Sequence, residues 1–305
     1  MNKSLVNTSC FFLPMNVGQT EATFMANVVT CILNLLLSPI TCAGNFIIVY
    51  VIWKSRDLHS PSFFLLGCLA AADFLVGVIC QPSLVARKIA ELQGDPSLIC
   101  PLSMLQSMSA WITSGVSLFI LALVSIDRLL ALTLHLRYNS IVTVSRMCFA
   151  VLLIWVAVAT TFSLRLAVTV TNWLIIPLLL LLITFLVIVF CTYKIFYIVG
   201  KHRRQIREQN IFVSVGPNAS NELKCRKSAA TILYVYGLLL TFYIPLFATV
   251  LAHNIIGYTG SVKIAYDFSA TAVFINSLWN PVVYCWRIRE IRQAVKSVLR
   301  RPQQH

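Results

Sequence analysis

Long apolar stretches recur along this chain of 305 residues, and they predict helices that cross a membrane. Seven stretches carry no charged residue or almost none, and each reaches or nearly reaches the roughly 20 residues that a membrane helix needs. Their ranges are 22–53, 60–86, 101–126, 147–164, 166–193, 228–262 and 268–286. Only Arg165 separates the fourth stretch from the fifth, so we expect a very short connection there.

The overall composition supports a protein embedded in lipid. Hydrophobic residues make up 58% of the chain and charged residues only 11%, against about 25% in a typical soluble protein. The net charge of +14 would suggest a nucleic-acid partner in a soluble protein, but these basic residues cluster in a few connections, so no such partner is expected. The ten cysteines show no zinc or redox spacing. We therefore predict an all-α protein, a seven-transmembrane helix bundle in a lipid bilayer.

The distribution of lysine and arginine predicts the orientation of the bundle. The connections after the first, third and fifth stretches and the C-terminal tail hold most of these residues. The positive-inside rule then places the N-terminus outside and the C-terminus in the cytoplasm. Two glycosylation sequons, at Asn2 and Asn7, lie in the expected outer segment and predict a glycoprotein.

The C-terminal tail combines basic residues with a regular apolar pattern. Ile288, Ile291, Val295 and Val298 or Leu299 recur at helical spacing, with arginine and lysine between them. This pattern favours a short helix in the membrane interface; a basic tail without regular structure is the alternative. We thus divide the chain into an extracellular segment 1–21, a seven-helix domain 22–286, and a cytoplasmic interfacial helix with its tail, 287–305.

An adjacent acid and base, Asp127-Arg128, end the third apolar stretch, and further apolar residues follow them. Charges at this depth are costly unless they neutralise each other or face water. A helix end whose long side chain reaches the interface would explain Arg128 alone. It explains poorly why the apolar pattern continues beyond the pair, which makes the pair a candidate functional site.

Asp73 is the only acid deep inside a predicted span. An aspartate near the centre of a membrane helix costs about 2.5–3.5 kcal/mol, so we expect it to have partners. The candidates are uncharged, oxygen-bearing residues of other helices: Asn45, Ser117, Asn276, Ser277 and Asn280. Such oxygen ligands suit a small hard cation such as sodium. A protonated Asp73 in an ordinary hydrogen-bonded network is the alternative.

Several motifs occur in a fixed order along these spans. They are Gly44-Asn45, Leu69-Ala70-Ala71-Ala72-Asp73, Asp127-Arg128-Leu129, Trp155, Tyr193, Pro245 and Asn280-Pro281-Val282-Val283-Tyr284. Through them the chain, over roughly 22–299, resembles a rhodopsin-like (class A) G-protein-coupled receptor. The second inner loop, the short second outer loop and the absence of the usual fifth-helix proline are most similar to the melanocortin–adenosine branch.

The resemblance implies a plasma-membrane receptor, not an enzyme, that transmits an extracellular ligand signal to heterotrimeric G proteins. It implies that Arg128 alternates between Asp127 and a G-protein contact, and that Leu136 is the apolar contact of the second inner loop. It also implies a sodium ion at the Asp73 cluster in the closed form, with no other cofactor. The full set of implied switch residues is Asp127, Arg128, Leu136, Tyr193, Tyr243, Asn280, Pro281 and Tyr284.

The chain departs from this family where ligands are recognised. Ala110 stands where amine receptors have an aspartate, and Phe274 stands where opsins have the retinal-binding lysine. The usual disulfide partner in the second outer loop is absent; a bridge between Cys10 and Cys100 is one alternative, and free thiols are the other. The remaining outer charges, which include Arg87, Lys88, Glu91, Lys263 and Asp267, do not identify a ligand.

Two other classes of membrane protein are less well supported. A transporter or channel would show paired ionisable residues along several helices, or paired broken helices in two repeats. An intramembrane enzyme would need two acids or a serine–histidine pair at depth. Neither pattern is present.

Overall fold

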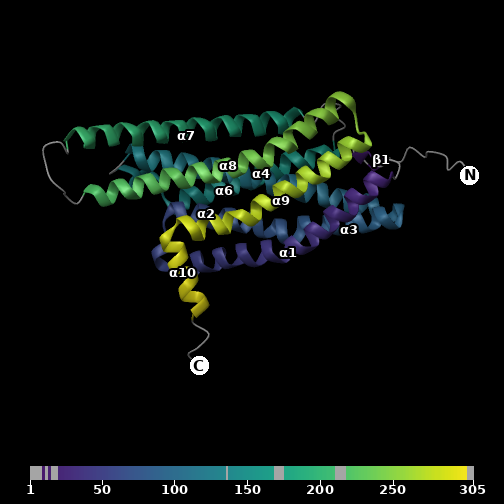
Figure 1. The fold of residues 1–305 in the computed structure, drawn as a ribbon, viewed down its shortest axis with the longest axis horizontal. Helices are drawn as coiled ribbons and strands as arrows, with labels where there is room; N and C mark the ends of the chain where they lie inside the picture. The colour runs from purple at the N-terminus through teal and green to yellow at the C-terminus, as the bar shows by residue number, and fades with distance from the viewer. Residues whose placement is uncertain are drawn as a thin grey trace, which may run out of the picture.

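The computed structural model describes residues 9–10, 13–14, 20–134, 137–167, 175–209 and 218–300. Long helices lie side by side, and the last helix turns away from their common axis (Figure 1). The helices are α1 (Glu21–Lys54), α2 (Pro61–Leu75), α3 (Gln81–Gln93), α4 (Pro96–Leu134), α5 (Tyr138–Ile141), α6 (Val144–Ala167), α7 (Ile175–Gln209), α8 (Asn218–Ile256), α9 (Gly260–Arg287) and α10 (Arg289–Arg300). A short 3-10 turn, Arg56–Leu58, joins α1 to α2.

Two short strands, β1 (Ser9–Cys10) and β2 (Leu13–Pro14), pair antiparallel near the start of α1. We call this end of the bundle the ribbon end and the opposite end the α10 end. The ends of α3 and α8 and the starts of α4 and α9 also lie at the ribbon end (Figure 1).

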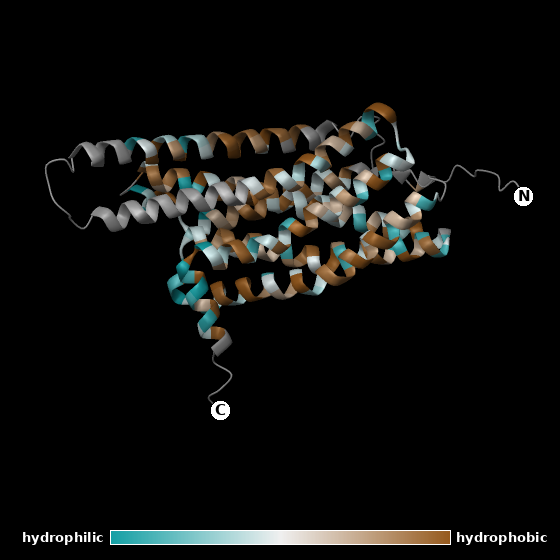
Figure 2. Ribbon diagram, in the orientation of Figure 1, coloured by the Kyte–Doolittle hydropathy of each residue, from teal (hydrophilic) through white to brown (hydrophobic). Residues whose placement is uncertain are grey.

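Within the described residues, six helical segments are long and apolar enough to cross a membrane. They come from α1, the α2–α3 unit, α4, α6, α7 and α8. Helix α9 has 28 residues and is also long enough, but its packed face is polar. Apolar residues dominate the long helices, whereas α10 is mostly hydrophilic (Figure 2). Together with α9 these segments give the predicted all-α bundle of seven transmembrane helices, which is confirmed.

The helices of this bundle carry apolar side chains outward and polar ones inward. On α1, Leu35 and Leu36 are exposed, whereas Asn27, Asn34 and Asn45 are buried. In water this arrangement would be unfavourable, but lipid solvates the outer side chains and the polar ones find partners inside.

Three predicted span boundaries are wrong. The fifth span was expected to begin at 166, but α6 continues to Ala167 and α7 runs from Ile175 to Gln209. The sixth span was expected to end at 262 and the seventh to begin at 268. Instead α8 ends at Ile256, because Gly257 adopts a φ of 78°, and Thr259 caps α9 by accepting from the Val262 amide. A connection that contains no charged residue cannot be distinguished from a membrane span by its lack of charge.

The second membrane helix is interrupted by a π-helical turn, Val76–Cys80, which joins α2 to α3. Pro82 follows it, and a proline cannot donate the usual helical hydrogen bond, so a widened turn is favoured here. The turn packs directly on α1: Ser38 Oγ donates to the Gly77 carbonyl at 2.8 Å. A Cβ atom on Gly77 would lie 2.7 Å from Cys42 Sγ and 3.0 Å from the Cys42 amide nitrogen, so only glycine fits.

Helix α10 occurs where the tail pattern predicted a helix. Its Ile291 is completely buried, and Ile288, Val295 and Val298 pack against the same apolar core. The apolar stripe therefore covers the ends of α1 and α9, which fixes α10 to the bundle.

Candidate functional site

Asp73 lies at the centre of a buried polar cluster between α2, α4 and α9. Its side chain has no exposed surface. Ser277 Oγ donates to Asp73 Oδ1 at 2.8 Å, and Ser117 Oγ donates to the same oxygen at 3.3 Å. Asn280 Nδ2 donates to Oδ2 at 2.6 Å. The structure thus brings three of the five predicted partners onto the carboxylate.

The other two predicted partners, Asn45 and Asn276, are buried nearby without touching the carboxylate. Asn45 Nδ2 donates to the backbone carbonyls of Thr41 and Ser277, each at 3.0 Å. Its Oδ1 is buried and has no hydrogen-bond partner in the described part of the chain. No hydrogen bond between Asn276 and Asp73 occurs among the described residues. An unsatisfied buried oxygen therefore lies beside the cluster, and this is a place for a water molecule or a cation.

The oxygens of this cluster fit a sodium ion chemically. Carboxylate, hydroxyl and amide oxygens are hard ligands, and Asp73 supplies the single formal negative charge. For Asn280 to coordinate a cation, its amide would have to present Oδ1 in place of Nδ2. The hydroxyl hydrogens of Ser117 and Ser277 would also turn away from the carboxylate.

Asp127 is fixed by two short hydrogen bonds near the α10 end. Ser62 Oγ, at the start of α2, donates to Asp127 Oδ2 at 2.6 Å, and the Tyr138 hydroxyl of α5 donates to Oδ1 at 2.6 Å. The pKa of Tyr138 is raised, first by burial and then by the adjacent Asp127 carboxylate, so its hydroxyl keeps the proton that it donates. Arg128 is held loosely in comparison: its Nε lies 3.9 Å from Asp127 Oδ2, and 31% of its side chain is exposed.

The other predicted switch residues lie at several places. The Tyr284 side chain in α9 is buried, and its hydroxyl has no hydrogen-bond partner within the described residues. Pro281, one turn earlier, packs beside Gly44 of α1. Tyr193 of α7 is 65% exposed on the outside of the bundle, away from Tyr284. Leu136 lies outside the described residues.

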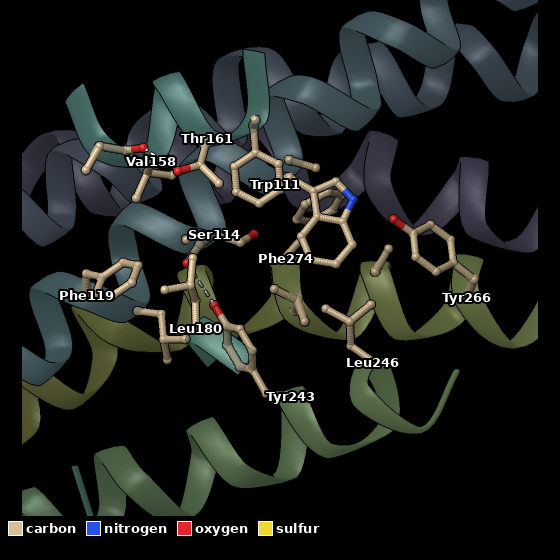
Figure 3. Close-up of a pocket in the computed structure, with 17 residues that line it drawn as sticks. Trp111, Ser114, Phe119, Val158, Thr161, Leu180, Tyr243, Leu246, Tyr266 and Phe274 are labelled. Carbon is tan, nitrogen blue, oxygen red and sulfur yellow. Dashed lines mark hydrogen bonds between the residues drawn. The ribbon is translucent and has the colours of Figure 1, made fainter. Parts of the chain in front are cut away.

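An apolar cavity of about 180 Å³ lies between α4, α6, α7, α8 and α9 (Figure 3). Its lining includes Trp111, which stacks on Phe162 with ring centroids 5.6 Å apart. Tyr243 forms part of the wall, and its hydroxyl donates to the Ser114 carbonyl at 3.5 Å. The predicted switch residue Tyr243 is therefore also a cavity residue.

None of the described residues that line this cavity is charged. Its polar groups are the hydroxyls of Ser114, Thr161, Tyr243 and Tyr266 and the indole nitrogen of Trp111. A cavity with apolar walls and a few hydroxyl groups suits a small, largely apolar molecule.

A second charged site lies at the ribbon end, where α3 and α9 meet. We call it the charge cluster; its members are Arg87, Lys88, Glu91, Lys263 and Asp267. Arg87 Nη2 donates to Asp267 Oδ1 at 2.8 Å, while Lys88 and Lys263 both donate to Oδ2. Lys263 Nζ also donates to Glu91 Oε2 at 2.9 Å.

Asn27 of α1 completes this network, because its Oδ1 accepts from Lys88 at 3.0 Å and from Lys263 at 2.9 Å. Tyr258 lies in the connection between α8 and α9. Burial raises the pKa of its hydroxyl, and the charges of Arg87, Asp267 and Glu91 also act on it. The cluster therefore ties three helices together at the ribbon end.

The sequence pattern did not reveal this cluster. Its five residues were expected in outer connections, but they lie within α3 and α9 and are largely buried. The spacing did contain a signal, since Arg87–Glu91 and Lys263–Asp267 are four apart, as in helical ion pairs. The pairing of α3 with α9 could be found only in three dimensions.

Cys10 of β1 and Cys100 of α4 form a disulfide bond. Of the two alternatives that the sequence left open, a bridge or free thiols, the structure has the bridge. This bond fixes the ribbon to the bundle. The sequons at Asn2 and Asn7 lie outside the described residues.

The chain is similar to known receptors. A family model described as "7 transmembrane receptor (rhodopsin family)" matches residues 44–174. Trace amine-associated receptor 8a of Rattus norvegicus is 26% identical, over 96% of this chain and 90% of its own length. Trace amine-associated receptor 1 of Macaca mulatta is 24% identical, over 85% of this chain and 84% of its own. Trace amine-associated receptor 9 of Homo sapiens is 26% identical, over 96% and 89%.

Proposed function

We propose that this chain is a rhodopsin-like G-protein-coupled receptor, and that it responds to a small, largely apolar ligand bound in the cavity between α4 and α9. The observation that carries the proposal is the cavity itself, which lies between five helices and has no charged side chain among the described residues of its lining. Tyr243 of α8, one of the switch residues that the family resemblance implies, forms part of its wall. Ligand contacts there bias the equilibrium between two helix arrangements.

The cavity argues against a small protonated amine as the ligand. The similar proteins are named trace amine-associated receptors. Aromatic rings line the cavity, but no described carboxylate does, so a buried ammonium group would lack a partner of opposite charge there. The position that amine receptors give to an aspartate is Ala110 here, and Ala110 lines the cavity. The ligand therefore differs in chemistry from an amine, even though the fold is shared.

A substitution that fills the cavity tests this proposal. Ala270→Phe adds a ring to a buried cavity residue of α9, and we expect it to lower the potency of an activating ligand at least tenfold at normal surface expression. Leu153→Phe, on the exposed face of α6, is the matched control and should change nothing. The assay is nucleotide exchange on G proteins against a panel of small apolar compounds. Equal responses in both variants would place the ligand elsewhere.

At the α10 end we propose that Asp127 and Arg128 couple this change to a heterotrimeric G protein. The structure has Asp127 held by Ser62 and Tyr138, with Arg128 loosely paired and partly exposed. This is the arrangement expected of a closed form, in which Arg128 is ready to leave Asp127. We further propose that the Asp73 cluster binds sodium in this form.

We also propose a cellular location for this chain and a branch of the receptor family to which it is related. A plasma-membrane location with the N-terminus outside is supported by the basic connections at the α10 end and by the Cys10–Cys100 bridge, since disulfides persist in oxidising compartments. A place in the melanocortin–adenosine branch is supported by the short α6–α7 connection and by Phe185 at the usual proline position.

A further inference from the structure

The charge cluster contains more positive than negative side chains. Arg87, Lys88 and Lys263 share the two carboxylates of Glu91 and Asp267. At most 14% of any of these side chains is exposed, and Lys88 has no exposed surface. Counted over the described residues, one positive charge is therefore left over in a region that water reaches poorly.

An uncompensated buried charge is unfavourable, and either the loss of a proton from a buried lysine or one additional anion relieves it. Arg87 also has a donor available for such an anion. Its Nε is buried and has no hydrogen-bond partner among the described residues, and Glu91 Oε1 lies 3.6 Å from it. A guanidinium group presents its donors in a fork that matches a carboxylate.

The cluster lies next to the cavity. Tyr266 lines the cavity beside Trp111 (Figure 3). The charges of Arg87 and Asp267 act electrostatically on its hydroxyl. Ala270, one helical turn after Asp267 on α9, also lines the cavity. A molecule that fills the cavity can therefore bring one end toward the cluster.

We propose that the charge cluster binds the carboxylate of an amphiphilic acid whose apolar part occupies the cavity. This inference rests on the proposed function, and it specifies the ligand class: a small apolar monocarboxylic acid, held by Arg87 and balanced by the surplus charge. The cavity volume of about 180 Å³ suits an apolar part near the size of a phenyl ring, since a cavity of about 150 Å³ holds benzene. A free halide ion would satisfy the same charge, and the experiment separates the two.

The test uses three probes with the same apolar body: phenylpropanoic acid, its methyl ester and phenylpropylamine. The thermal unfolding midpoint of the purified full-length receptor is measured against the concentration of each, in buffer without chloride. We expect the acid to bind about tenfold more tightly than the ester, as for one added charge-assisted hydrogen bond, and the amine to bind most weakly. Equal stabilisation by acid and ester overturns this inference and leaves the cavity proposal intact. If none of the three probes stabilises the receptor, both fail. If chloride alone stabilises it and removes the advantage of the acid, the site is a halide site.

Two substitutions with opposite expected effects make the test specific. Arg87→Gln removes the free donor and the surplus charge, so the advantage of the acid over the ester should disappear. Glu91→Gln removes the carboxylate nearest to Arg87 Nε, so that advantage should grow several-fold. Lys54 is exposed at the end of α1. Lys54→Gln removes one positive charge, as Arg87→Gln does, and should leave the advantage of the acid unchanged. If Arg87→Gln keeps the preference, or if both cluster variants shift it in the same direction, Arg87 does not bind the carboxylate.

Discussion

Replacing Tyr138 with phenylalanine should raise signalling in the absence of ligand. The Tyr138 hydroxyl donates to Asp127 Oδ1 at 2.6 Å, and Asp127 is 1% exposed. In the proposed mechanism this bond exists only in the closed form, where Asp127 restrains Arg128. Tyr138→Phe removes the donor and leaves the ring, so it weakens the closed form without leaving a large cavity.

The expected magnitude follows from the hydrogen bond. A hydrogen bond to a charged group contributes about 1.5–3 kcal/mol. We take the lower end, because Asp127 keeps Ser62 and Arg128 as partners. About 1.5 kcal/mol corresponds to roughly tenfold in a two-state equilibrium. An open form populated at about 1%, within the usual range for a minor state, would then rise to about 10%.

The assay is nucleotide exchange on G proteins by the receptor without ligand, compared at equal surface expression. Tyr197→Phe is the matched control, since it makes the same chemical change at an exposed position of α7. Ser62→Ala should act in the same direction as Tyr138→Phe, because it removes the other short hydrogen bond to Asp127. Basal exchange that stays at the wild-type level in both the Tyr138 and Ser62 variants would refute the restraint.

Three further substitutions test other parts of the structure. Sodium, but not potassium, should raise the unfolding midpoint of the unliganded receptor, and Asp73→Asn should abolish this increment because the cluster loses its only formal charge; a midpoint equally insensitive to both ions would favour a protonated Asp73. Arg128→Ala should keep surface expression but remove G-protein activation, and undiminished activation would contradict its coupling role. Gly77→Ala should lower the unfolding midpoint by several degrees, because the added Cβ would lie 2.7 Å from Cys42 Sγ. Gly237→Ala is the control and should not lower it, because no atom lies within 4 Å of the added Cβ. Equal midpoints for the two variants would show that the contact between α1 and the π-helical turn can relax.

Local pattern was sufficient to predict the class of fold. Solvation by lipid acts on each stretch separately, so length and hydropathy identify most of the membrane helices, and the short charge-free stretch 268–286 indicated α9, whose packed face is polar. Asp73 could be expected to have oxygen-bearing partners for a similar reason: a single acid at that depth must be compensated, and few polar residues are available on the neighbouring helices. The structure places Ser117, Ser277 and Asn280 on its carboxylate.

Only the tertiary structure decided which charges meet. Arg87 and Asp267 are 180 residues apart and form a buried pair that no local pattern specifies. A charged residue marks the end of a span in a hydropathy profile, yet Arg87 and Asp267 lie inside helices, because they pair with each other across α3 and α9. For the same reason the sequence could not show that Tyr138 holds Asp127. The hydropathy of a segment determines whether lipid or water solvates it better. The partners of a buried charge depend instead on how the helices are arranged in space.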